Sequence, residues 1–268
     1  MTTPDVPHRI ELTCELPAPP EQVWEAIATG AGLTSWFLPT EIEGREGGRI
    51  VTYMGESDSS AGEVTGWDPP RRLEYVEPDW ADLADHEPGP VTPLVTEFLV
   101  EARSGGTSVL RVVSSAFGTG ADWEQEFFDG MEEGWLPFFA HLELYLRDFA
   151  GRAATAVQAA RTVGTTSAPT WHALVADLGP LEVGRAVTVR GLEGHVHRAA
   201  DRHLLVRVDD PYPGFVALWA FDLREGRALA QAHVYLFSPD AAGYADQEGK
   251  GWQAWLDALP LPDPAADR

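Results

Sequence analysis

One long aromatic stripe constrains the fold of this chain more than any other feature of its sequence. Between about residues 123 and 150, large apolar side chains recur at every third or fourth position, which is the period of an α-helix. They are Trp123, Phe127, Met131, Trp135, Phe138, Leu142, Tyr145 and Phe149. Asp122 stands where a helix N-cap is expected. A helix of this length with one apolar face has to be covered by another layer of structure.

The chain before this helix predicts an antiparallel sheet. Residues 9–16 alternate apolar and polar side chains, which is typical of a strand with one buried face. Two short helices are expected next, around Val23 and around Trp36. Short turns rather than helices separate the strands that follow, so they favour a meander. These strands are expected at residues 40–44, 48–55, 61–68, 71–77, 94–101 and 107–114. Residues 79–93 are acidic, contain three prolines, and read as a loop over the sheet.

The second half of the chain repeats parts of this order. A glycine turn, a strand and a closing helix with a tryptophan each occur twice, in the same order along the chain. The echoes are Gly47-Gly48-Arg49 with Val183-Gly184-Arg185, Arg72-Leu73 with Arg202-His203, and Gly134-Trp135 with Gly251-Trp252. We therefore predict an α+β chain of two domains, residues 1–161 and 170–268, joined by a linker at 162–169. The second domain is expected to be a shortened copy of the first that lacks the opening strand.

Composition excludes several classes of partner. The formal charge of −23 repels nucleic-acid phosphates and anionic lipid surfaces, so neither nucleic acid nor membrane is expected as a partner. No run of about 18 apolar residues occurs, and the first residues do not resemble a secretory signal. The single cysteine, Cys14, lies in the alternating strand 9–16 and reads as a buried thiol in a reducing compartment. These features predict a cytoplasmic protein.

Several short segments, taken in order, carry a family resemblance. They are residues 18–27 (APPEQVWEAI), 32–37 (GLTSWF), 62–64 (GEV), 68–75 (DPPRRLEY) and 130–135 (GMEEGW). Together they resemble the START-like superfamily, also called SRPBCC, and within it bacterial relatives of the activator of heat-shock-protein ATPase. The resemblance covers about residues 9–150. It implies a helix-grip fold, in which a curved antiparallel sheet closes around a long C-terminal helix and leaves a cavity between them. Members of the superfamily bind lipids, hormones or polyketides, cyclise polyketides, or assist chaperones.

The aromatic residues around the predicted cavity are its candidate ligand-binding set. An apolar pocket with few polar groups suits a hydrophobic ligand. The same residues would also be explained by core packing alone, because burial of each contributes about 1.5–3 kcal/mol. The candidate set is Trp36, Phe37, Tyr53, Tyr75, Trp80, Phe98, Trp123, Phe127, Met131 and Trp135.

Other candidate chemistry is sparse. His195, His197 and His203 would meet around a metal ion only if a tight turn set His197 opposite His203. A solvated strand face explains them as well, and we expect neither a metal nor a cofactor. Glu124 and Asp129 are the helix carboxylates nearest to the aromatic stripe, whereas the other acidic residues of the helix read as a solvent-exposed face. No hydrolase elbow, phosphate loop or dinucleotide fingerprint occurs.

The leading functional interpretation is a non-catalytic protein that binds a small hydrophobic molecule between sheet and helix. One alternative is a polyketide cyclase or hydrolase that uses the same pocket. A polar pair deep in the pocket, such as Asp129 with a tyrosine, would favour that enzyme. Another alternative is a co-chaperone-like module, and either a protein partner or a second copy of the chain stays open as a binding partner.

Overall fold

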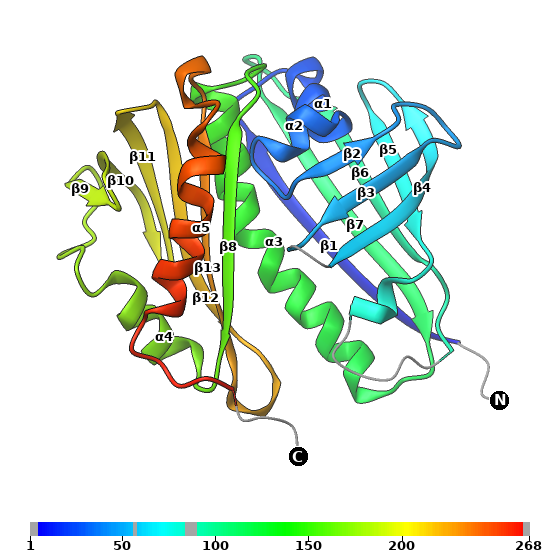
Figure 1. The fold of residues 1–268 in the computed structure, drawn as a ribbon. Helices are drawn as coiled ribbons and strands as arrows, with labels where there is room; N and C mark the ends of the chain where they lie inside the picture. Colours follow the sequence, from blue (N-terminus) through cyan, green and yellow to red (C-terminus); the bar gives the residue numbers. More distant parts are fainter. Residues whose placement is uncertain (1–4, 56–57, 84–89, 265–268) are drawn as a thin grey trace. The chain divides into compact units, whose positions relative to one another are not determined.

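The computed structural model describes residues 5–55, 58–83 and 90–264. The chain divides into two compact units, Met1–Ala153 (unit 1) and Ala154–Arg268 (unit 2), and each unit has its own sheet and helices (Figure 1). None of the helices in the described residues is long and apolar enough to cross a membrane.

Unit 1 contains a seven-stranded sheet in which every strand pair is antiparallel. Its strands are β1 (Val6–Leu16), β2 (Thr40–Ile42), β3 (Arg49–Tyr53), β4 (Ser59–Asp68), β5 (Arg72–Glu77), β6 (Leu94–Ala102) and β7 (Ser108–Gly118). The spatial order is β1-β7-β6-β5-β4-β3-β2, so the first strand closes the meander by pairing with the last. The predicted alternation in β1 is confirmed, since Ile10 and Leu16 are buried while Arg9 and Glu11 are exposed.

The helices of unit 1 are α1 (Pro20–Ala28), α2 (Gly30–Thr34), the short 3-10 helix η1 (Trp80–Leu83) and α3 (Asp122–Asp148). The long helix α3 runs along one face of the sheet, which we call the inner face (Figure 1). This is the predicted helix-grip arrangement. Asp122 is not the N-cap, because α3 is capped at Ala121 and the carboxylate of Glu124 accepts the Ala121 N–H at 3.2 Å.

The loop expected over the sheet at residues 79–93 lies partly outside the described residues. Its described beginning is η1, where the indole of Trp80 is buried and donates to the carbonyl of Thr92 at 2.9 Å. The Thr92 N–H in turn donates to the carbonyl of Phe117 at 2.8 Å. Both described ends of this segment are therefore fixed to the core of unit 1.

Unit 2 repeats the design with one strand fewer. Its strands are β8 (Thr155–Val163), β9 (Ala186–Val189), β10 (Leu192–Ala200), β11 (His203–Asp210), β12 (Gly214–Asp222) and β13 (Ala228–Leu236), in the antiparallel order β8-β13-β12-β11-β10-β9. Its helices are α4 (Ser167–Val175), η2 (Arg224–Gly226), η3 (Pro239–Ala241) and α5 (Tyr244–Asp257). The closing helix α5 packs on β8 and β13.

Two expectations about unit 2 are wrong. The opening strand is present as β8, which pairs with β13 just as β1 pairs with β7. The linker expected at 162–169 instead contains the end of β8 and the start of α4, and the units divide after Ala153. Residues 151–169 are rich in alanine and end in Gly164-Thr-Thr-Ser-Ala-Pro169, a composition that suggested a linker. Val157, Ala159 and Val163 are nonetheless buried at the period of a strand.

The internal repeat is visible in the backbone hydrogen bonds. In unit 1, Gly47 N–H donates to the Val64 carbonyl and Val64 N–H donates to the Gly48 carbonyl, each at 2.8 Å. In unit 2, Gly184 N–H donates to the Val196 carbonyl at 2.8 Å, and Val196 N–H donates to the Arg185 carbonyl at 2.9 Å. The first echo noted in the sequence therefore marks the same turn in both units, but Gly47 corresponds to Gly184 rather than to Val183, so the alignment of that echo was wrong by one residue.

The strand after this turn bends in the same way in both units. A register shift follows Val64 in β4 and Val196 in β10. Two residues before each shift stands a glycine on which a Cβ atom would collide with a backbone oxygen, at 2.3 Å for Gly62 and 2.0 Å for Gly194. Because Val64 pairs with Tyr75 and Val196 pairs with Val206, Arg202 corresponds to Arg71. The second sequence echo, which matched Arg202 to Arg72, was thus wrong by one residue.

Candidate functional site

The shared register allows the inner faces of the two units to be compared position by position. The inner face of unit 1 carries a group of polar side chains on adjacent strands, which we call the polar row: Ser60, Tyr75, Glu77, Thr96 and Ser114. The residues of unit 2 at the same register positions are Leu192, Val206, Val208, Val216 and Val234. Every polar member is therefore replaced by an aliphatic one.

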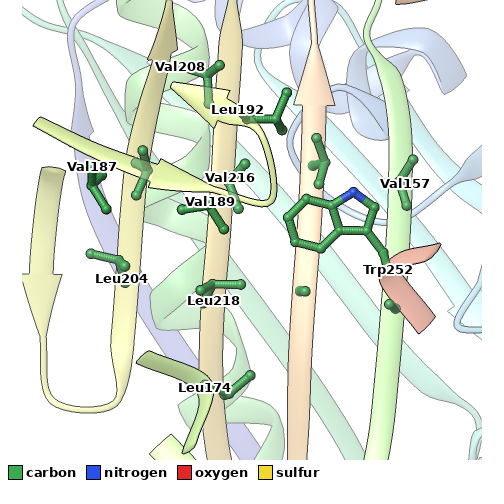
Figure 2. Packing of buried hydrophobic residues seen from close by; sticks show 14 of the residues in the cluster. Val157, Leu174, Val187, Val189, Leu192, Leu204, Val208, Val216, Leu218 and Trp252 are labelled. Atoms are coloured by element: carbon green, nitrogen blue, oxygen red, sulfur yellow. The ribbon is translucent and has the colours of Figure 1, made fainter. Parts of the chain in front are cut away.

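The apolar inner face of unit 2 is filled by its own closing helix. Trp252 of α5 is fully buried and belongs to one cluster with Val157, Val216 and Leu218 (Figure 2). Its indole N–H donates to the Tyr244 hydroxyl at 3.0 Å, so the ring is both packed and hydrogen bonded. This inner face is a conventional hydrophobic core.

Glu77 is the acidic member of the polar row. It ends β5, is half-buried, and accepts a short hydrogen bond from the Ser60 hydroxyl. No other residue in the described parts of the chain hydrogen bonds to this carboxyl. Burial raises the pKa of Glu77 above its ordinary value, and the Ser60 hydrogen bond offsets part of that increase.

Tyr75 precedes Glu77 by two residues and points to the same face. Its hydroxyl is hydrogen bonded to Thr96, whose own hydroxyl lies 3.1 Å from that of Ser114. Burial, followed by the nearby charge of Glu77, raises the pKa of Tyr75 well above its ordinary value. The phenol is therefore neutral at physiological pH and keeps a proton that it can donate.

Aromatic side chains surround the polar row on both sides. The ring of Phe98 stacks on that of Tyr75, with 6.2 Å between the ring centroids, and packs edge to face on Trp135 of α3, with 5.8 Å between the centroids. Phe37 in turn stacks on Trp135 at 5.1 Å. At the N-terminal end of α3, Trp80 lies 4.8 Å from Phe127 and 5.8 Å from Trp123.

Most of the predicted ligand-binding residues lie in these two aromatic groups. Trp36, Trp80, Phe98, Trp123 and Trp135 are buried, whereas Phe37, Tyr75, Phe127 and Met131 are half-buried. Tyr53 does not join them: it is 37% exposed, and its hydroxyl donates to Glu41 at 3.2 Å. Thr52 rather than Tyr53 has the inward register on β3, since Thr52 pairs with Ser60.

The helix carboxylates behave differently from the polar pair considered in the sequence. Asp129 is exposed and accepts a hydrogen bond from Gln125 at 2.8 Å. Glu124 is fully buried and lies 3.0 Å from the His8 imidazole. Burial alone would raise the pKa of Glu124, but hydrogen bonds from Thr119, Gly120 and His8 lower it below its ordinary value. Glu124 is thus a structural anion, and Glu77 is the inward carboxyl that the sequence interpretation missed.

One signal for Glu77 was present in the sequence. Leu73, Tyr75 and Glu77 follow one another at the period of a strand, so they share one face. The strand expected at 71–77 ended at Glu77, just before the acidic loop, and its carboxyl was not among the candidate site residues.

His141, His195 and His203 each contact other residues of the protein. His141 is buried and its Nδ1 lies 3.3 Å from the Trp36 carbonyl oxygen. His203 pairs with Ala200 rather than with His197, so the register assumed for a metal site is wrong. His195 lies 3.2 Å from Asp209 on the exposed side. Within residues 5–55, 58–83 and 90–264, no group of three metal-ligating side chains comes together.

Unit 2 also has an open surface pocket of about 490 Å³. Its polar lining includes the carboxylates of Asp177, Glu193, Asp209 and Asp210. The pocket lies at the edge of the core of unit 2, since its lining includes the core residue Val187. Carboxylates at an open surface are the ordinary finding in a chain with a charge of −23.

Comparison with known proteins supports the resemblance found in the sequence. Residues 17–147 match the family described as "Activator of Hsp90 ATPase homolog 1-like protein". No curated protein matches the chain.

Solved structures match either unit 1 or both units. A protein from Mesorhizobium loti is 22% identical over 53% of this chain and 98% of its own, with a TM-score of 0.46. BexL, a di-domain ARO/CYC protein of the BE-7585A biosynthetic pathway, is 17% identical over 91% of this chain and 89% of its own, with a TM-score of 0.42. DynU16, from the dynemicin biosynthetic locus, is 18% identical over 94% of this chain and 96% of its own, with a TM-score of 0.43. No functional property follows from similarity at this level.

Proposed function

Since the chain belongs, through residues 17–147, to the Activator of Hsp90 ATPase homolog 1-like family of the START-like superfamily, we propose that unit 1 binds a small, largely apolar molecule. The ligand would lie between the inner face of the sheet and α3. Aromatic rings would contact most of its surface, and the polar row would contact its polar group.

The observation that carries this proposal is the contrast between the two inner faces. Both units have the same turn, the same bulge and the same crowded glycine, so the backbone alone does not require a polar inner face. Unit 2 shows that valine and leucine at these positions give a packed core. Polar groups buried in place of apolar ones cost free energy unless they are hydrogen bonded, and the hydrogen bonds within the polar row at best offset that cost. Glu77 and Tyr75 in unit 1 are therefore better explained by a ligand than by stability.

A fluorescence titration with N-phenyl-1-naphthylamine, a neutral apolar probe, tests the proposal on the full chain. We expect saturable binding and a rise in the unfolding temperature of unit 1 with probe concentration. Met131→Trp would enlarge a half-buried side chain in the aromatic stripe of α3 and is expected to weaken binding at least about tenfold. Native mass spectrometry of the purified protein would report any co-purified molecule, and whether the chain is a monomer or the homodimer that the sequence leaves open.

The matched control is Leu136→Trp on the same helix. Leu136 is 56% exposed, so an added ring at this position leaves the inner face unchanged. The proposal fails if the probe does not bind, or if both tryptophan variants weaken its binding equally.

A second candidate function is acid–base catalysis by the same site. Glu77 has a raised pKa and stands beside a neutral phenol, and such a pair can move protons on a bound substrate. This places a carboxyl and a tyrosine in the role that the sequence interpretation gave to Asp129 and a tyrosine. An enzyme would lose turnover in Glu77→Gln while keeping probe binding, whereas a pure binding protein would show no turnover to lose.

Co-chaperone activity, which the family description names for relatives, is a weaker candidate. It would act through surface contacts and would not require the polar row. The single cysteine, the half-buried Cys14, cannot form a disulfide within the chain, which suits a cytoplasmic location.

A further inference from the structure

The inner and outer faces of the sheet in unit 1 differ in charge. Every arginine on the described strands of unit 1 except Arg49 forms ion pairs on the opposite, outer face. Arg9 and Arg111 bind Glu11, and Arg72 binds Glu74 and Glu97. Arg49 lies opposite the exposed Glu63 in the strand register, one residue away from an inward-facing position. The chain's single lysine, Lys250, belongs to unit 2.

The histidines near the inner face are already engaged. His8 has the inward register on β1, but its Nε2 lies 3.0 Å from the buried carboxylate of Glu124. His141 lies against the Trp36 carbonyl oxygen. Among the described residues, an anionic ligand on the inner face of unit 1 would therefore meet Glu77, and no uncommitted arginine of the strands faces it there. Burial of an unpaired charge is strongly unfavourable.

The hydrogen-bonding pattern of the polar row points to a donor on the ligand. Ser60 donates to one oxygen of Glu77, and no second donor in the described residues reaches the other oxygen. A carboxylate accepts several hydrogen bonds. Because no buried side-chain oxygen of the described residues lacks a partner, the second oxygen of Glu77 is open to solvent or to a ligand. A ligand hydroxyl would supply the missing donor without bringing a charge.

We infer that unit 1 selects a neutral ring compound carrying a hydroxyl group, a phenol or an alcohol whose O–H donates to Glu77, and that it rejects carboxylates. Tyr75, two residues earlier on the same face, is placed to donate to an oxygen acceptor of the same ligand. This inference rests on the proposed function, since it names the chemistry of the ligand that unit 1 would bind.

Three naphthalene derivatives with one ring system separate the possibilities. 2-Naphthol is a neutral donor, 2-methoxynaphthalene lacks the donor, and 2-naphthoate carries a charge at a pH of about 8. Each would compete with bound N-phenyl-1-naphthylamine on the full chain. We expect 2-naphthol to bind about tenfold tighter than 2-methoxynaphthalene, because it alone donates to a carboxylate. We expect 2-naphthoate to bind at least about tenfold more weakly than 2-methoxynaphthalene.

Glu77→Gln tests which residue is responsible. The amide removes the negative charge, so both ratios are expected to shrink towards one. Glu63→Gln is the matched control, because Glu63 loses the same charge from the exposed face of the neighbouring strand β4. It should leave both ratios unchanged.

The outcomes of these experiments separate the two proposals. If the probe does not bind at all, the proposed function fails and the inference fails with it. If the probe binds but 2-naphthoate competes as well as 2-naphthol, only the inference is overturned. The wild-type ranking decides this without any variant, and unchanged ratios in Glu77→Gln would equally refute the role of Glu77.

Discussion

Replacing Glu124 by glutamine should destabilise unit 1 far more than an ordinary change of one surface charge. The Glu124 carboxylate accepts the N–H groups of Thr119, Gly120 and Ala121 at 2.9, 2.8 and 3.2 Å. It also accepts the Thr119 hydroxyl at 3.0 Å and lies 3.0 Å from His8. This one side chain therefore joins the start of α3, the end of β7 and the inner face of β1.

The magnitude follows from counting acceptors. A glutamine has one acceptor oxygen, which takes about two of these hydrogen bonds, and its amide group faces the remaining donors. At least two of these donors, most of them part-buried, lose their partner, and each such loss costs about 1–3 kcal/mol. The expected destabilisation is about 2–6 kcal/mol, a large part of the 5–15 kcal/mol that holds a typical domain folded.

Urea and thermal unfolding of the full chain would measure this loss. For a domain of this size we expect the unfolding temperature of unit 1 to fall by at least about 4 °C. Hydrogen exchange of peptides covering 115–125 would show whether the loss is local to this junction. Glu132→Gln, an exposed position on the same helix, is the control and should change stability by less than about 0.5 kcal/mol.

The pH dependence gives an independent check. The folded-state pKa of Glu124 lies below the ordinary value of 4.5, so its contribution is complete above about pH 4.5 and is lost as the pH falls through the lowered pKa. The difference between wild type and Glu124→Gln should therefore shrink in acid. A variant as stable as wild type at neutral pH, or a difference that does not respond to acid, would refute this structural role of the Glu124 carboxylate.

Three further predictions concern packing and reactivity. Gly62→Ala and Gly194→Ala should each destabilise their unit by more than about 1 kcal/mol in urea unfolding, because the new Cβ would lie 2.3 or 2.0 Å from a backbone oxygen. Gly130→Ala in α3 is the matched control. No atom lies within 4 Å of its Cβ position, so this variant should stabilise unit 1 by about 0.5–1 kcal/mol. Trp252→Ala should cost unit 2 about 3–5 kcal/mol while probe affinity in unit 1 stays unchanged, and a loss of probe binding would contradict the assignment of the site to unit 1. Burial raises the pKa of the Cys14 thiol to about 12, so its reaction with a disulfide reagent near neutral pH should be much slower in the folded than in the urea-unfolded chain; equal rates would show that the thiol is accessible.

The sequence predicted the parts of the fold that local patterns determine. The stripe from Trp123 to Phe149 specified α3, and the alternation through Ile10 specified β1. Both signals depend on the side chains of one element and its burial, so no knowledge of distant partners was required.

What the sequence did not predict depends on distant partners. The strand β8 was missed because alanine side chains give little contrast between buried and exposed positions, and its pairing with β13 lies in tertiary structure. Glu124 was expected among the carboxylates near the aromatic stripe, and its structural role was missed because its partner His8 lies on the first strand. Glu77 could not be singled out from the sequence, because its contrast with Val208 depends on the strand register of both sheets.

The crowded glycines have a consequence for how this architecture can change. Since a backbone oxygen, not a side chain, excludes a Cβ atom at Gly62 and Gly194, the close approach of the strands at these two positions does not depend on which side chains line the sheet. The frame and the lining can therefore be engineered separately. Grafting the five polar side chains of one half into the other, together with a smaller residue in place of Trp252, is the rational route to giving unit 2 the lining on which the proposed site of unit 1 depends.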